Sequence, residues 1–133
     1  MSGEISQEDV KTLAAIRREL RAFLHFSEAE ATRQGVTPQQ HQAMLAVAGS
    51  SGGALTIGEL AEALLVRHHS ASGLVTRLEA LGLVERCATD EDARRRVVRL
   101  TAAGDRRIAA LSEAHREELR RLRTMLVKLL NAL

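Results

Sequence analysis

Residues 56–101, TIGELAEALLVRHHSASGLVTRLEALGLVERCATDEDARRRVVRLT, contain the pattern that decides the fold. Thr56 and, three residues later, Glu59 form a capping box, which predicts a short helix through about Leu65. After a turn, a second helix stops at Gly82 and has apolar residues on one face, namely Leu74, Val75, Leu78 and Leu81. Two short helices joined by a tight turn predict a helix-turn-helix.

The pattern then changes to short strands. Residues 83–87 and 95–101 read as two strands, and the polar, acidic residues 88–94 between them suit a hairpin tip. A two-stranded ribbon is only marginally stable by itself, so we expect it to pack against the helices. Together these elements predict a mainly α protein with a small two-stranded β wing, a winged helix-turn-helix.

Long helical patterns flank this unit. A capping box at Ser6 and Asp9 opens an apolar stripe that runs past six turns and ends near Gly35. Thr37 as N-cap and Pro38 at the first helical position predict another helix over about residues 38–48. Residues 102–133 are helical again, as one helix or as two.

Length and composition suit one domain spanning residues 1–133. The 45% hydrophobic content is enough for a core, and no apolar run approaches the roughly 20 residues that cross a bilayer. We therefore expect no membrane association. The single cysteine, Cys87, excludes an internal disulfide and is typical of a reducing cytoplasm, where we expect the protein to reside.

The uneven distribution of charge indicates a localised anion-binding surface, although on charge alone ordinary solvated side chains are the favoured interpretation. Net charge is only +2, but residues 67–107 sum to +3 while residues 1–66 sum to −3. A helix with small polar residues at its start fits the major groove, and arginines at a wing tip can reach phosphates or the minor groove. The predicted DNA-binding residues are Arg67, His68, His69, Ser70, Ser72, Thr76, Arg77, Arg94, Arg95 and Arg96. Asp92 is assigned a structural role in the wing.

The sequence resembles the MarR family of transcription regulators. The resemblance is carried by residues 60–61 and 76–86, by the Asp92-Ala93-Arg94 wing motif, and by Leu100-Thr101-Ala102-Ala103-Gly104. It implies a homodimer that acts as a repressor on a pseudo-palindromic operator, with dimerisation helices at about residues 1–36 and 105–133 around a winged unit at 37–104. Gly73, where the family has a side chain, is a departure, as is the compact C-terminal part.

The resemblance also implies a small aromatic or phenolic effector. We place it in a cleft between residues 17–26, residues 41–45 and the start of the C-terminal helix, with Arg17, Arg21 and His41 as carboxylate partners. Surface ion pairing explains the two arginines equally well.

Other functions compete with this interpretation. A winged protein-interaction module without DNA binding and a redox sensor acting through Cys87 remain open, although a buried, inert cysteine is favoured. No motif indicates an enzyme, a cofactor or a metal site. His25, His41 and His115 are interpreted as separate histidines, each satisfied by its own surroundings.

Overall fold

The computed structural model describes residues 3–89 and 94–133 and contains, in that part of the chain, helices and one small sheet. The elements in chain order are α1 (Gln7–Arg33), α2 (Pro38–Ala48), a 3₁₀ turn (Ser51–Gly53), β1 (Ala54–Leu55), α3 (Ile57–Leu64), α4 (His68–Ala80), β2 (Val84–Ala88), β3 (Arg96–Leu100) and α5 (Ala102–Asn131). This is the predicted fold class, and the C-terminal segment is one continuous helix.

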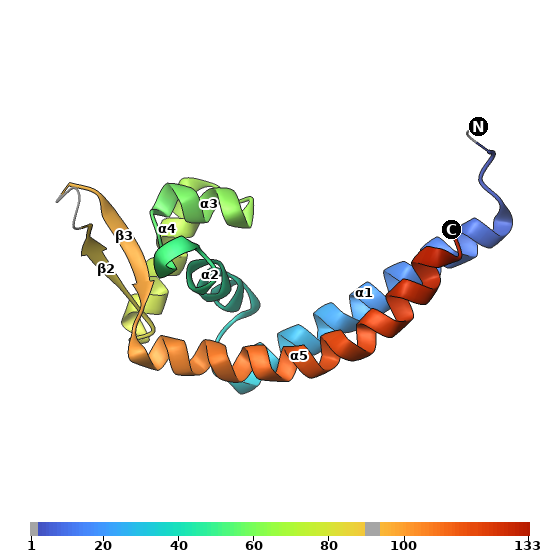
Figure 1. Cartoon of the computed structure of the whole chain (residues 1–133). Coiled ribbons are helices and arrows are strands. Elements are labelled where there is room, and N and C mark those ends of the chain that lie inside the picture. Colours follow the sequence, from blue (N-terminus) through green and yellow to red (C-terminus); the bar gives the residue numbers. More distant parts are fainter. Residues whose placement is uncertain (1–2, 90–93) are drawn as a thin grey trace.

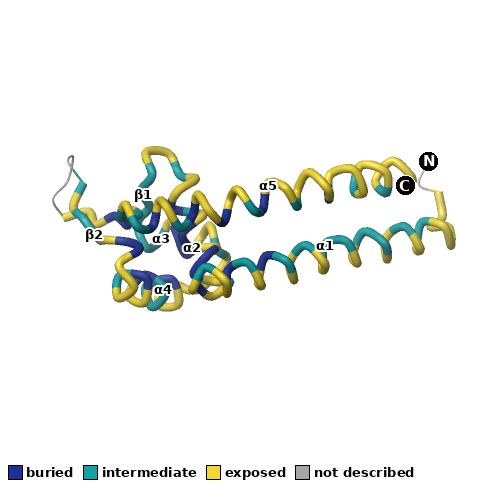
Figure 2. Tube along the Cα trace, turned by 90° about the horizontal axis from the view of Figure 1, so that it is seen from below, coloured by how far each residue is buried: buried dark blue, intermediate teal, exposed yellow. Residues whose placement is uncertain are grey.

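Two regions differ in shape. Helices α1 and α5 lie side by side and form a long projecting arm, while α2, α3, α4 and the sheet form a body at one end of it (Figure 1). Dark, buried segments gather in the body, and most of the arm is exposed or half-buried (Figure 2). We call the angle between arm and body, where α2 faces α5, the elbow.

Local capping signals set the helix starts. The capping boxes at Ser6, Thr37 and Thr56 are all formed, with side chain and backbone hydrogen bonds in both directions. Each box satisfies backbone N–H groups that a helix start leaves without partners. Helix α2 therefore has the predicted bounds, and α3 ends one residue before its predicted end.

The sheet has a third strand that the sequence alone does not predict. Strand order is β1-β3-β2, all antiparallel, and β1 contributes only two residues, with Ala54 opposite Arg99 and Leu55 opposite Val98. Arg99 also donates through Nη1 to the carbonyl of Gly52, at 3.0 Å. A strand of two residues is too short to show an alternating pattern in the sequence. It forms because it pairs with residues more than 40 positions away, which no local pattern indicates.

The core lies around α2, in the body and where the body packs against α5. Its largest fully buried side chains are Met44, Val47, Leu60, Val75, Leu78, Val98 and Leu111. Leu81, which the sequence places on the apolar face of its helix, is not in the core, since it is 52% exposed, and Leu45 on α2 is 43% exposed. Leu81 lies at the C-cap of α4, beyond the last buried turn, and Leu45 faces the elbow.

The turn of the helix-turn-helix contains a strained leucine. Leu65 has φ 57° and ψ 42°, the left-handed conformation, and its side chain is 93% exposed. A Cβ in this conformation costs roughly 1–2 kcal/mol, and so exposed a side chain returns little packing energy.

Leu65→Gly should therefore raise the free energy of unfolding by about 1 kcal/mol, as measured by urea denaturation. The neighbouring Val66→Gly is the control, because Val66 has no positive φ and should lose stability. A destabilised Leu65→Gly would mean that the leucine makes contacts worth more than its strain.

The arm joins the body at a tight junction. The Thr101 hydroxyl donates to the carbonyl of Gly82 at 2.6 Å and accepts from the Gly104 N–H at 3.1 Å. The Thr101 N–H donates to the carbonyl of Leu83 at 3.0 Å. The first turn of α5 is thus bonded directly to the end of α4, and a shift of the arm must move the end of α4 as well.

Candidate nucleic-acid interface and elbow pocket

Helix α4 presents its polar face to solvent. Ala71, Val75 and Leu78 are buried against the body. The predicted contact residues at its start, Arg67, His68, His69 and Ser70, are all exposed, and Arg67 forms the N-cap without a side-chain hydrogen bond. The first turn of α4 is therefore open to a large partner, with a cationic residue and the positive end of the helix dipole together.

In the middle of the polar face of α4, some hydrogen-bonding groups are bound by Arg86, which is not among the predicted DNA-binding residues. Arg86, on β2, donates through Nη2 to the Thr76 hydroxyl at 3.2 Å and to the Ser72 carbonyl at 3.5 Å, and its Nη1 lies 3.0 Å from Glu79. The Thr76 hydroxyl itself donates to the Ser72 carbonyl. Ser72 is half-buried, and Arg86 ties the wing to α4 through both predicted contact residues.

Arg77 is exposed and lies over Gly73. A Cβ placed on Gly73 would lie 3.8 Å from Arg77 Nη1, which is ordinary van der Waals contact. Glu79, two residues further along α4, pairs with Arg86 and not with Arg77. Arg77 is thus available on the face that α4 presents to solvent.

The wing adds cationic side chains beside α4. Arg94, Arg95 and Arg96 are all exposed. Arg95 donates to Glu59 at 3.1 Å, and Glu59 also caps α3, so hydrogen bonds from Thr56 first and then Arg95 hold the pKa of that carboxyl below its usual value. Arg96 makes no ion pair within residues 3–89 and 94–133. Asp92 lies outside the described residues.

Cys87 is a half-buried free thiol on β2. Its Sγ lies 3.9 Å from the carbonyl oxygen of Val97, across the strand pair. The expected burial of Cys87 is therefore only partial.

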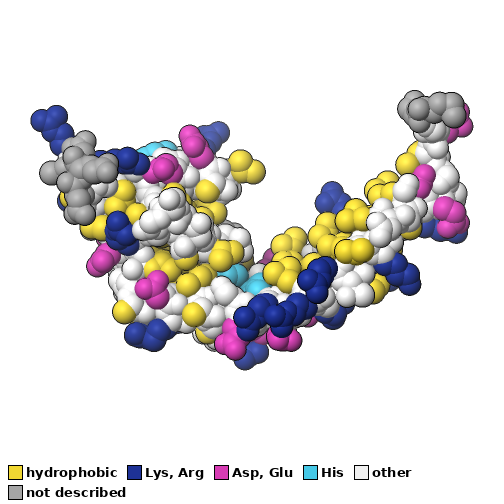
Figure 3. Space-filling view, in the orientation of Figure 1, with side chains coloured by type: hydrophobic (Ala, Val, Ile, Leu, Met, Phe, Trp, Pro, Cys, Tyr) yellow, Lys and Arg dark blue, Asp and Glu magenta, His cyan; other side chains and the backbone are white. Residues whose placement is uncertain are grey.

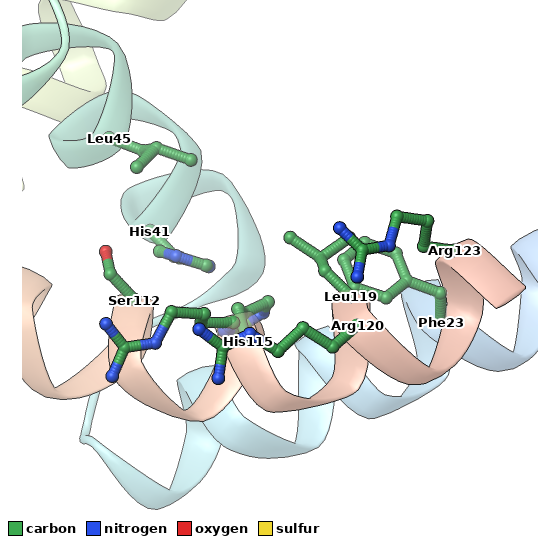
Figure 4. Close-up of a pocket in the computed structure, with 9 residues that line it drawn as sticks. Phe23, His41, Leu45, Ser112, His115, Leu119, Arg120 and Arg123 are labelled. Carbon is green, nitrogen blue, oxygen red and sulfur yellow. The ribbon is translucent and has the colours of Figure 1, made fainter.

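A pocket of about 410 Å³ occupies the elbow (Figure 4). Its lining combines three apolar side chains, three arginines, two histidines and a serine. These are Phe23, Leu45 and Leu119, then Arg116, Arg120 and Arg123, then His41 and His115, and Ser112. The arginines come from one side of α5, since residues three and four apart lie on one helix face.

Two histidines meet at the base of the pocket. His115 is buried and bonds through Nδ1 to the Leu111 carbonyl at 2.7 Å, so Nδ1 carries the proton and Nε2 accepts from the Ser27 hydroxyl at 2.8 Å. The ring of His41 lies 5.0 Å from that of His115, centroid to centroid. His41 is only 3% exposed, and its Nδ1 has no hydrogen-bond partner among the described residues.

The predicted effector residues are only partly brought together. His41 lines the pocket, whereas Arg17 and Arg21 are exposed on α1 and do not. The cationic groups come from the middle of α5 instead. The expectation of separate histidines is also wrong for His41 and His115, although His25 is exposed and apart. The sequence does contain a pattern that indicates a packed His115, because His115 is four residues from both Leu111 and Leu119 and so lies on the apolar face of its helix.

Burial of His41 makes a prediction about acid stability. Burial first, and then the electrostatic interaction with His115, lowers the pKa of His41 below the ordinary 6.5. As the pH falls through 6.5, His41 takes up a proton in the unfolded chain before it does so in the folded protein. The free energy of unfolding should therefore be constant above about pH 7 and decrease as the pH drops through 6.5.

Urea denaturation at several pH values, for the wild type and His41→Gln, measures this dependence. The variant should lose part of the acid-induced destabilisation, while His25→Gln, at an exposed histidine, should retain it. Equal pH profiles for His41→Gln and wild type would refute the assignment.

These elements define a class of protein: a helix-turn-helix followed by a β wing, carried on a two-helix arm. Residues 34–95 match the sequence profile of the MarR family. This part of the chain, which carries the helix-turn-helix and most of the wing, is similar to the MarR family, and the fold comparisons agree. No curated protein matches the sequence.

Solved structures extend the likeness to the arm. AbsC, a MarR family transcriptional regulator from Streptomyces coelicolor, is 21% identical over 94% of this chain and 84% of its own, with a TM-score of 0.74. A variant of S. aureus MepR bound to an oligodeoxyribonucleotide is 20% identical over 87% and 93%, with a TM-score of 0.70. CouR from Rhodococcus jostii, bound to p-coumaroyl-CoA, is 19% identical over 80% and 73%, with a TM-score of 0.70.

Two absences concern the described residues alone. None of their helices combines the length and apolar character needed to cross a membrane. Likewise, within residues 3–89 and 94–133 no three histidine, cysteine or acidic side chains come together as a metal site would require.

Proposed function

We propose that the protein is a dimeric transcription regulator that binds a pseudo-palindromic DNA operator and is released from it by a small ligand. The observation that carries the proposal is the exposed polar face of α4 beside an arginine-bearing wing, on a chain that is similar to the MarR family. The MepR structure bound to an oligodeoxyribonucleotide supports DNA as the partner. On this basis the protein acts by binding and not by catalysis.

The arm supports a homodimer. Among the described residues, nine of the thirteen exposed large apolar side chains lie on the arm or at its ends. They are Ile5, Val10, Leu13, Leu24, Leu119, Met125, Val127, Leu130 and Leu133. Exposed apolar side chains concentrated in one region are typical of an interface, and a two-fold axis would bring equivalent surfaces together.

A symmetric dimer presents two α4 helices. Half-sites about one turn of DNA apart, ~34–36 Å, accept two such helices only when the angle between the bodies is right. The bonds from Thr101 to Gly82 and Gly104 connect each arm rigidly to its α4. A ligand that changes the angle at the elbow therefore changes the spacing of the recognition helices.

The elbow pocket is the proposed effector site. It has apolar walls for an aromatic ring and three arginines for an anionic group, with His41 Nδ1 still lacking a partner among the described residues. CouR, with its bound p-coumaroyl-CoA, supports a ligand with both an aromatic and an anionic part. Such a ligand regulates only if it binds one arrangement of arm and body better than the other.

The experiment has two stages. Selection from random duplexes identifies the operator, and affinity for it should fall with salt with a log–log slope of about −0.9 per phosphate contact. Aromatic carboxylates are then titrated against the complex, for the wild type and Arg116→Gln. Absent or salt-insensitive DNA binding would favour a winged interaction module. DNA binding that no such compound changes would remove the ligand-release part of the proposal.

A further inference from the structure

The elbow pocket holds positive charge that is not neutralised locally. No acidic side chain of the described residues lines it, and the nearest ion pair is the 3.6 Å contact of Arg120 with Glu117, between side chains that are both more than half exposed. Arg116 and Arg123 make no ion pair among the described residues. Because the other wall is apolar, the natural occupant of the pocket must be both apolar and anionic.

The free end of the arm has that composition. Glu4, Ile5 and Glu8 are exposed there, and Ile5 is followed along α1 by exposed Val10. The ion pair of Glu8 with Lys11, at 3.4 Å, leaves both side chains largely exposed. Acidic side chains gather at the free end of the arm, and arginines gather at the elbow (Figure 3).

The symmetry of a dimer brings these two regions together. Exposed large apolar residues on the α1 side begin at Ile5 and end at Leu24, so their centre lies near Ala14 and Ala15. Those on the α5 side run from Leu119 to Leu133, with a centre near Leu126. The two sets form one surface if both centres lie at the same level of the arm.

An ion pair within the arm shows that they do. Glu19 on α1 and Arg121 on α5 are 3.7 Å apart, and the two helices are antiparallel. Five residues further toward the free end, residue 14 is level with residue 126. A two-fold axis at this level exchanges the ends of the surface, so the partner's Ile5 arrives beside Leu24, next to the pocket residue Phe23.

We propose that the acidic N-terminal end of one protomer's arm fills the elbow pocket of its partner, so that each pocket is completed by the second copy. The partner's Glu4 and the partner's Glu8 face Arg116 and Arg123, and the partner's Ile5 packs against the apolar wall. This inference rests on the homodimer of the proposed function. An anionic ligand then competes with a carboxylate segment of the protein itself, which links ligand binding to the geometry of the dimer.

Cross-linking tests the contact directly. In a Cys87→Ser background, Ile5→Cys and Leu24→Cys are combined in one chain and treated with a short bis-maleimide. Within one protomer Leu24 lies about 25 Å along α1 from Gln7, and Ile5 comes before Gln7, so the two positions are too far apart to be bridged and a product must join two copies. We expect a covalent dimer, whereas Ile5→Cys with Leu65→Cys, at the remote helix-turn, should give none.

Charge exchange provides a second readout. Glu4→Arg with Glu8→Arg, and separately Arg116→Glu with Arg123→Glu, should each weaken the dimer about tenfold at low salt. All four changes in one chain should restore affinity to within about threefold, because each contact regains opposite charges. Glu62→Arg with Arg106→Glu, on the body, should leave the dimer unchanged. Dissociation constants are measured by analytical ultracentrifugation.

Three outcomes overturn the inference. A dimer that cross-links Leu24→Cys to Leu130→Cys and not to Ile5→Cys would show that the end of α5 fills the elbow. A dimer in which the four changes do not restore affinity would refute the charge contact. Both leave the proposed regulator standing, whereas a wild-type monomer at micromolar concentration would refute the dimer and the inference together.

Discussion

Replacing Gly104 by alanine should lower the free energy of unfolding by about 2–3 kcal/mol. A Cβ at this position would lie 2.1 Å from the carbonyl oxygen of Leu83 and 3.3 Å from Cβ of Leu100. The oxygen is backbone, bonded to the Thr101 N–H, and it cannot turn aside as a flexible side chain could. The first turn of α5 must therefore move away from the end of α4.

The measurement is urea denaturation of Gly104→Ala beside Gly58→Ala. Gly58 is also in the first turn of a helix, but the nearest atom to its Cβ, Thr56 Oγ1, is 3.9 Å away. The control should gain up to about 1 kcal/mol from the helix propensity of alanine. Equal effects of the two substitutions would show that the junction tolerates a methyl group.

Loosening this junction should also affect regulation. The Thr101 hydroxyl relays the position of α5 to Gly82, at the end of α4. If the proposed coupling between arm and recognition helix runs through this junction, Gly104→Ala should reduce the effect of a ligand on operator affinity more than it reduces operator affinity itself.

How far the sequence predicts the fold depends on how local each signal is. The capping boxes at Thr37 and Thr56 act over three residues, and the helices that they begin are found where expected. Strand β1 depends on pairing with Arg99 and Val98, far along the chain, so no local pattern predicts it. The sequence leaves the length of α5 open, because the uninterrupted course of that helix depends on packing along α1.

In the candidate sites, too, features that depend on local sequence could be predicted, and features that depend on contacts between distant residues could not. Which residues of α4 are exposed could be predicted from its apolar stripe. The role of Arg86 could not, since it depends on β2 bringing that side chain to Thr76 and Glu79. Arg17 and Arg21 are predicted at the elbow pocket, but the arginines that line it are on α5. Whether the arginines of α1 or those of α5 face the pocket depends on how each helix is rotated about its axis, and tertiary packing sets that rotation.

The second large effect should be on DNA affinity. In the proposed dimer, Arg77→Ala removes two cationic groups, one from each α4, and should lower operator affinity by roughly 10- to 100-fold. Arg77 is exposed, and its guanidinium lies beside Gly73 with no acidic partner among the described residues, so stability should hardly change. If Arg77 contacts phosphate, the log–log salt slope falls by about two and all sequences are affected alike.

The wing arginines should differ in how much each contributes to operator affinity in the same assay. Arg95 is held by Glu59 at 3.1 Å, whereas Arg96 is exposed and makes no ion pair in the described part of the chain. Arg96→Ala should therefore weaken operator binding more than Arg95→Ala, although both remove the same charge from the same strand end. The triple change Arg94→Ala, Arg95→Ala and Arg96→Ala should weaken it most, with an unfolding transition close to wild type.

Fluorescence anisotropy at several salt concentrations gives both affinity and slope for each variant. Ser72→Ala or His69→Ala should instead change the preference among sequences, by ~1–3 kcal/mol for each base that the side chain reads. Wild-type affinity in Arg77→Ala and in the triple variant would show that α4 and the wing do not form the DNA-binding surface. If Arg95→Ala were the most damaging single change, the ion pair with Glu59 would be positioning the wing on DNA, and the order predicted from the free structure would be reversed.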